Sequence, residues 1–218
     1  MKEQLLTLMD GQIDVAGLKV LLPRMNTADI AEVFGELGKE KAIQIFRMLP
    51  KSIAADVFSY IDADEQQIII EALTDSEIGE IINSLFADDA VDFIEEMPAN
   101  VVKHVLQNVN PEKRTVINQL LRYPDDSAGS IMTTEYVDHL EDVTVREACD
   151  AIRATGLNRE TLYNCEVIRR DRMLVGVVSA KTLMLAKPHE RIGDVMDTKL
   201  VFAQTTDDQE KVAGLFKK

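Results

Sequence analysis

The chain has 218 residues, with 24 Lys and Arg against 38 Asp and Glu, for a formal net charge of −14. This charge repels phosphate backbones, which argues against nucleic acid as a partner, and the length suffices for one large domain or two small ones. Two cysteines without metal-ligand spacing, and no apolar run near twenty residues, predict a soluble protein of a reduced cytosolic compartment.

The N-terminal part is organised by an apolar residue that recurs every twelve positions. The eight anchors are Leu37, Leu49, Ile61, Leu73, Leu85, Met97, Val109 and Leu121. Further apolar residues lie three and four positions before most anchors, which is the spacing of one helix face. Each repeat therefore predicts a short amphipathic helix, and the helices are expected to form a right-angled stack that buries the anchors.

Residues that favour helix N-caps set the predicted phase of this stack. They stand three positions after five anchors, at Ser52, Asp64, Ser76, Asp88 and Asn100. The helices are accordingly expected to begin near residues 41, 53, 65, 77, 89, 101 and 113.

The middle of the stack is strongly acidic. Between Lys51 and Lys103 there is no Lys or Arg, whereas thirteen Asp and Glu occur. Single acids have a structural explanation, because Asp88 is a natural N-cap and Asp89 and Asp92 suit a helix N-terminus. Capping explains neither the number of acids nor the lack of bases. A hard cation such as Mg²⁺, which prefers carboxylate oxygens and keeps several waters, would suit this surface.

The pattern changes after residue 124. Apolar, β-rich runs at 165–168 and 174–179 alternate with helical stretches at 145–155 and 180–186, which predicts a second domain of the α/β class. Residues 129–133 and 193–197 match at an offset of 64 residues. A second copy of this module is thus expected to supply a first strand near residue 201 and a helix over about 208–218. The rest of that copy is missing, so we infer that the natural polypeptide is longer.

The junction LRYPDDSAGSIMTTEYV at 121–137, preceded by an acidic helical repeat, resembles the cytosolic part of MgtE-type magnesium channels. The resemblance implies an acidic helical superhelix over 1–124, a first CBS module over 125–190 and an incomplete second CBS module over 191–218. The implied function is magnesium sensing at the cytoplasmic face of the cell membrane. The implied partners are a second copy bound through the CBS modules and a transmembrane pore domain outside this chain.

The resemblance also places Mg²⁺ sites between the helical and CBS domains. The candidate ligands are Asp88, Asp92, Asp89 and Asp56 on the helical side, and Asp208 and Glu210 on the other. The twelve-residue register puts Asp56, Glu80 and Asp92 at equivalent outward positions. Asp208 has a simpler interpretation as the cap of the last helix.

Other functions find less support in the sequence. Three scattered histidines and the lack of a Gly-rich phosphate loop predict no enzyme. CBS modules often bind adenine nucleotides through an Asp that holds the ribose, and Thr182 stands at that position. The alternative left open is a protein-interaction solenoid without metal, fused to a CBS module that senses adenine nucleotides.

Overall fold

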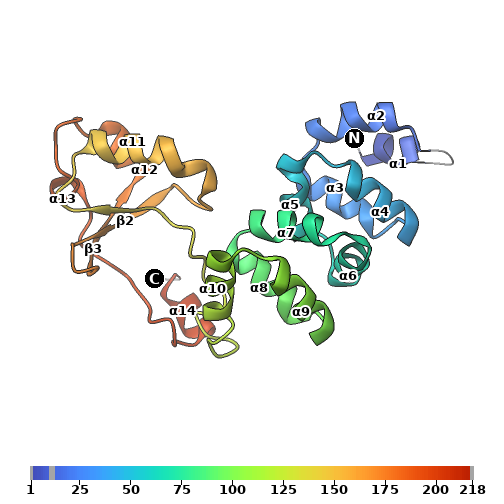
Figure 1. The fold of residues 1–218 in the computed structure, drawn as a ribbon. Coiled ribbons are helices and arrows are strands. Elements are labelled where there is room, and N and C mark those ends of the chain that lie inside the picture. The colour runs from blue at the N-terminus through green and yellow to red at the C-terminus, as the bar shows by residue number, and fades with distance from the viewer. Residues whose placement is uncertain (1, 10–12, 217–218) are drawn as a thin grey trace. The chain divides into compact units, whose positions relative to one another are not determined.

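The computed structural model describes residues 2–9 and 13–216. The chain divides into two compact units, Met1–Leu121 and Arg122–Lys218, here termed the helical unit and the sheet unit (Figure 1). No helix among the described residues is long and apolar enough to cross a membrane.

Short helices make up the described part of the helical unit, and helices two apart in sequence pack on each other. They are α1 (Lys2–Met9), α2 (Val15–Leu21), a 3₁₀ turn (Leu22–Arg24), α3 (Thr27–Phe34), α4 (Lys39–Met48), α5 (Lys51–Ser59), α6 (Ala63–Ala72), α7 (Asp75–Ser84), α8 (Ala87–Glu96), α9 (Ala99–Asn108) and α10 (Pro111–Leu120). The packed pairs include α4 with α6, α7 with α9 and α8 with α10. This arrangement confirms the predicted fold class of a helical stack followed by an α/β part.

The twelve-residue period holds from α4 to α10, but every helix begins two residues earlier than predicted. Between α6 and α7, for example, only Leu73 and Thr74 are extended, and these two residues suffice to turn the chain. The predicted caps Ser52, Asp64, Ser76, Asp88 and Asn100 therefore each occupy the second position of a helix. The actual N-caps from α5 to α10 are Pro50, Asp62, Thr74, Phe86, Pro98 and Asn110.

The anchors form the core, as predicted. Leu49, Ile61, Leu73, Leu85 and Met97 are all less than a tenth exposed, although Leu37 and Leu121 at the ends of the series are only half-buried. A second series at the same period supplies aromatic rings that meet edge to face: Phe34 on Phe46 at 6.2 Å, and Phe46 on Phe58 at 5.9 Å, between centroids. Phe93 of α8, which lies outside this period, also packs edge to face on Phe58, at 5.2 Å between centroids.

The sheet unit is a small sheet covered by helices. Its elements are β1 (Asp138–Leu140), α11 (Val145–Thr155), a 3₁₀ turn (Gly156–Asn158), β2 (Asn164–Ile168), β3 (Leu174–Ser179), α12 (Ala180–Leu185), α13 (Ile192–Val195) and α14 (Gln209–Leu215). The strand order is β1-β2-β3, with β1 parallel to β2 and β3 antiparallel to it. Val145, Cys165, Val167, Val178 and Ile192 lie at the centre of its core. The predicted strands and helices of the first module are confirmed.

The strand expected at the start of the second copy is absent from the described residues. Val201 and Phe202 lie outside any strand and are 76% and 70% exposed, because no described strand lies beside them. The helix of that copy is present as α14, and residues 217–218 lie outside the described part. Asp197 instead pairs with Val177 at the free edge of β3, with N–O distances of 2.9 and 2.8 Å. Gly176 permits this close approach, since a Cβ there would meet the Met196 sulfur.

Candidate metal site on helix α8

Helix α8 separates an apolar face from an acidic one. Its buried residues include Val91, Phe93 and Ile94, which pack into the stack. Asp88 and Asp92 are four positions apart, so their carboxylates lie one turn apart on the same side of the helix. Because the N-cap is Phe86, Asp88 does not cap the helix, and the capping explanation of this acid was wrong. Its place in the first turn still benefits from the helix dipole.

The surroundings of Asp92 disfavour the charged form of its carboxyl. Desolvation by its surroundings raises the pKa of this carboxyl, although the residue as a whole is exposed. Among the described residues no base forms an ion pair with Asp92, nor with Asp56, which is exposed on α5. A cation bound beside Asp92 would stabilise its charged form and lower that pKa. Asp92 is therefore an acid whose charged form a bound cation would stabilise.

The acids of α7 differ, because a basic side chain of another helix lies close to each of them. Glu80 is held by Lys51, whose Nζ lies 2.6 and 2.8 Å from the two carboxylate oxygens. Arg47 lies 3.5 Å from Glu77, and the His104 Nε2 lies 3.4 Å from the Asp75 carboxylate. Glu80 and Asp92 are thus not equivalent, although the repeat register made them so.

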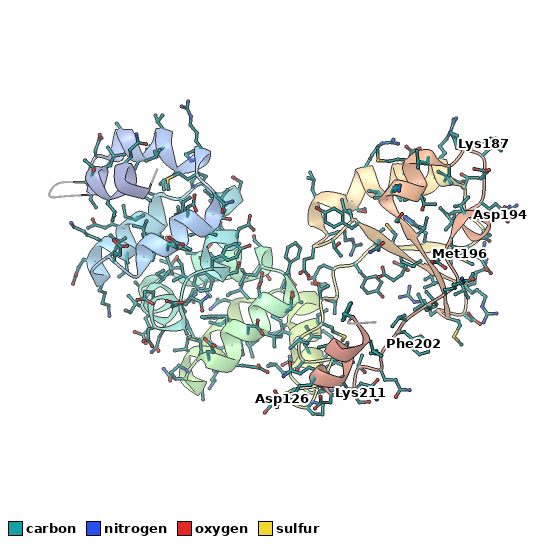
Figure 2. The ribbon with its side chains drawn as sticks, turned by 180° about the vertical axis from the view of Figure 1, so that it is seen from behind. Asp126, Lys187, Asp194, Met196, Phe202 and Lys211 are labelled. Carbon is teal, nitrogen blue, oxygen red and sulfur yellow. The ribbon has the colours of Figure 1, made fainter. Side chains whose placement is uncertain are left out.

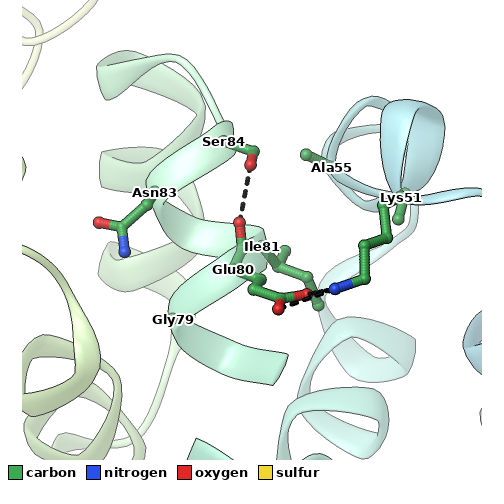
Figure 3. Close-up of a pocket in the computed structure, with 8 residues that line it drawn as sticks. Lys51, Ala55, Gly79, Glu80, Ile81, Asn83 and Ser84 are labelled. Atoms are coloured by element: carbon green, nitrogen blue, oxygen red, sulfur yellow. Dashed lines mark hydrogen bonds and ion pairs between the residues drawn. The ribbon is translucent and has the colours of Figure 1, made fainter. Parts of the chain in front are cut away.

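A pocket of about 420 Å³ between α5 and α7 lies beside one of these pairs (Figure 3). Ala54, Ala55 and Ile81 give it apolar walls, and the Lys51–Glu80 pair crosses its edge. The acids of α8 do not line it, so the pocket is separate from the candidate metal site.

The two candidates of the sheet unit lie at the start of α14. Asp208 caps this helix, because its Oδ1 accepts the backbone N–H groups of Glu210 and Lys211 at 2.9 and 3.2 Å. The simpler interpretation of Asp208 is thereby confirmed. Glu210 is exposed in the first turn. The neighbouring Asp207 receives a hydrogen bond from Lys211 at 2.7 Å, which holds its pKa below the usual value.

The described residues contain no cluster of three or more His, Cys, Asp or Glu that could enclose a metal ion. What the structure brings together is the α8 pair Asp88 and Asp92, with Asp89 beside them, while Asp56 lies on α5. Two carboxylates on one helix face fit Mg²⁺, which takes few protein ligands and keeps most of its waters. They would not enclose a dehydrated ion.

The ion pairs of the acidic stretch were not foreseen from the sequence. Lys51 and Glu80 are 29 residues apart, as are Asp75 and His104, and Arg47 and Glu77 are 30 apart. This separation equals two repeats plus five or six residues, which joins facing turns of neighbouring helices. Oppositely charged residues 29 or 30 positions apart are therefore a pattern in the sequence that could have predicted these ion pairs.

Thr182 supplies no carboxylate at the position where CBS modules that bind adenine nucleotides carry an Asp. The hydroxyl of Thr182 lies 2.9 Å from that of Ser179, and Ser179 caps α12 by accepting the Thr182 N–H. Thr182 is thus used within the turn, and no nucleotide-binding residue is assigned.

Comparison with known proteins finds similarity to MgtE magnesium transporters. Residues 25–126 match the family model described as the MgtE intracellular N domain. The magnesium transporter MgtE of Thermus thermophilus is 33% identical over 205 residues, which are 93% of this chain and 46% of that protein. The magnesium transporter MgtE of Bacillus subtilis is 35% identical over 102 residues, 47% of this chain and 23% of that protein. The chain thus spans less than half the length of either relative.

Solved structures agree over a longer range. A crystal structure of the cytosolic domain of the Mg²⁺ channel MgtE in complex with ATP matches all of this chain and 88% of its own, at 31% identity and a TM-score of 0.89. The soluble part of a magnesium transporter matches 99% of this chain and 85% of its own, with a TM-score of 0.90. At 24% identity, this second match concerns the fold alone.

Proposed function

Because this chain belongs to the MgtE family of magnesium transporters, we propose that it is the cytosolic region that senses Mg²⁺ and regulates the transporter. The observation that carries the proposal is the pair Asp88 and Asp92 on one face of α8, with Asp92 desolvated and unpaired with any described base. Unlike Asp92, the acids of α7 are paired with basic side chains of other helices. The cation from solution is therefore assigned to the α8 face, beside Asp92.

Hydrated Mg²⁺ would be held by Asp88 and Asp92, with Asp89 and Asp56 as further ligands. The acids at the start of α14, Glu210 and Asp208, supply the counterpart in the sheet unit. An ion held by both sets favours a compact, closed state of the regulatory region, whereas the same carboxylates repel each other without the ion. Because Mg²⁺ binds the compact state more tightly than the open one, it increases the fraction of molecules in the compact state.

Several weak sites suit this task better than one tight site. Moving an equilibrium from 1:99 to 99:1 requires about 5.5 kcal/mol of differential binding, or about 1–2 kcal/mol from each of three or four ions. In the full-length protein, the regulated partner is a transmembrane pore domain. The CBS-type modules, proposed over 125–190 and from 191 onward, join two copies into a dimer.

Thermal unfolding at millimolar Mg²⁺ tests the proposal. A ligand that binds only the folded state raises its stability, so Mg²⁺ is expected to raise the Tm more than NaCl of equal ionic strength. The double variant Asp88→Asn with Asp92→Asn is expected to lose this excess. The charge-matched control is Asp62→Asn with Asp64→Asn, two exposed acids at the N-cap and in the first turn of α6, which should keep it.

Equal effects of Mg²⁺ and NaCl on the Tm would contradict magnesium sensing and favour an acidic face that is merely solvated. If both double variants lose the Mg²⁺-specific gain equally, the ion is bound diffusely and the assignment to α8 is wrong.

A further inference from the structure

The junction string has a structural role inside the sheet unit. Its residues 126–129 run beside residues 205–209, which lead into α14. The Ala128 N–H donates to the Asp207 carbonyl and the Gly129 N–H to the Thr205 carbonyl, each at 2.7 Å. In return, the Gln209 N–H donates to the Asp126 carbonyl at 2.8 Å. Three backbone hydrogen bonds thus join segments that lie far apart in the sequence.

Two residues of the string are specialised for this contact. Asp126 adopts a left-handed backbone with φ of 61°, which is costly for a residue other than glycine and persists only where its surroundings hold it. Its Oδ1 accepts a hydrogen bond from the Gln209 side-chain amide at 2.7 Å. At Gly129 a Cβ would lie 2.5 Å from the Tyr123 ring and 2.8 Å from the Thr205 carbonyl oxygen, so only glycine fits.

The opposite segment is braced as well. The Asp207 carboxylate accepts the Gln204 N–H at 2.9 Å and binds Lys211 at 2.7 Å, so it fixes the turn before α14 to the helix itself. Figure 2 labels one residue of each segment, Asp126 of the junction string and Lys211 of α14. The junction therefore attaches to a turn that is rigidly continuous with α14.

We propose that residues 126–129 and 205–209 form a clasp that makes the start of α14 and the connecting chain move as one body. A free linker would absorb a displacement of α14, whereas the clasp passes it to the chain that leads from the helical unit. Asp126, Gly129 and Gln209 are thus positioning residues for communication between the units. This inference rests on the proposed function for its purpose, but the clasp itself requires no ion.

Hydrogen exchange of the Ala128 and Gly129 amides tests the clasp, in the full chain with EDTA present. Gln209→Ala removes the side-chain bond to Asp126 and is expected to speed exchange of both amides roughly fivefold. Asp126→Asn keeps an acceptor oxygen and tolerates the left-handed backbone, so it should stay near the wild type. The matched control is Gln204→Ala, because Gln204 uses its backbone N–H rather than its side chain in the turn.

Tryptic cleavage after Arg122, which is exposed at the beginning of the connection, gives a second readout. It should accelerate in Gln209→Ala and not in Gln204→Ala. The proposal is overturned if exchange and cleavage in Gln209→Ala match those of Gln204→Ala. Because EDTA removes divalent ions, a failure of magnesium sensing leaves this result unchanged, and a failure of the clasp leaves the Mg²⁺-dependent Tm unchanged.

Discussion

The helical unit and the sheet unit place their polar groups differently. Among the described residues, the fully buried polar side chain of the helical unit is Gln66, whose amide donates to the Phe58 carbonyl at 2.8 Å. In the sheet unit the buried Nε2 of His139 and Oε2 of Glu166 have no hydrogen-bond partner among the described atoms. The described acids of the helical unit are exposed or half-buried as residues, although the Oδ1 atom of Asp88 is buried, while the sheet unit holds titratable groups in or near its core.

The difference indicates what each unit responds to. Surface carboxylates on a repeated scaffold respond to ions in solution, because an ion can be shared without disturbing the core. Buried titratable groups respond to pH, because the fold must tolerate one protonation state better than the other. The predictions that follow test this division, beginning with the largest effect.

Truncation of the aromatic series should be the most damaging change. Phe58 is fully buried and packs against Phe46 and Phe93, so Phe58→Ala is expected to cost about 3–5 kcal/mol of unfolding free energy in the helical unit. The measurement is urea denaturation followed by far-ultraviolet circular dichroism. Tyr60→Ala, at a 62% exposed site next to the same helix, is the control and should change stability by less than about 0.5 kcal/mol.

If Phe58→Ala and Tyr60→Ala unfold at the same urea concentration, the ring series is not the core that joins the repeats. A loss confined to α5 and its neighbours would show that the stack unfolds repeat by repeat rather than as a whole.

A smaller, pH-dependent effect is expected in the sheet unit. Burial lowers the pKa of His139, so the unfolded chain takes up a proton more readily than the folded one. Stability is then fully present above the unfolded value of about 6.5 and is lost as the pH falls below it. Burial raises the pKa of Glu166, which acts in the opposite direction but nearer the acidic range.

Calorimetry between about pH 7.5 and 6 isolates the histidine. The Tm of the sheet unit should fall across this interval in the wild type, and His139→Leu should flatten the fall whatever its effect on the Tm itself. The exposed His189, changed to Gln, is the matched control. An unchanged slope in His139→Leu would show that another group controls the response.

The core of the stack could be predicted from the sequence because a twelve-residue period fixes which positions of each repeat face the interior. The anchors Leu49 to Met97 were placed in the interior by spacing alone. The predicted phase is wrong by two residues because the second position of each helix from α5 to α9, like an N-cap, is occupied by Ser, Asp or Asn. Thr74 and Glu77 form a capping box, and their mutual hydrogen bonds mark the true start of α7. A Thr followed three residues later by a Glu is a known sequence pattern of a helix N-terminus, so this boundary could have been predicted.

The candidate site was predictable only in part. The lack of bases between Lys51 and Lys103 pointed to the acidic helices, and the i, i+4 spacing pointed to Asp88 and Asp92. Which acids already have basic partners depends on contacts between helices two or three apart, and the repeat period alone does not predict these contacts. The bond between Asp126 and Gln209 joins residues 83 positions apart, so no local pattern could reveal it.

The central claim is that α8 binds Mg²⁺ through Asp88 and Asp92, and paramagnetic relaxation by Mn²⁺ tests it most directly. Mn²⁺ shares the preference of Mg²⁺ for carboxylate oxygens, and it broadens the amide resonances of nearby residues. In the ¹⁵N-labelled chain, a trace of Mn²⁺ should first broaden residues 87–93, excess Mg²⁺ should restore them, and Asp88→Asn with Asp92→Asn should prevent the broadening. Equal broadening of α6 and α8, or broadening that Mg²⁺ does not reverse, would contradict a magnesium site on this helix.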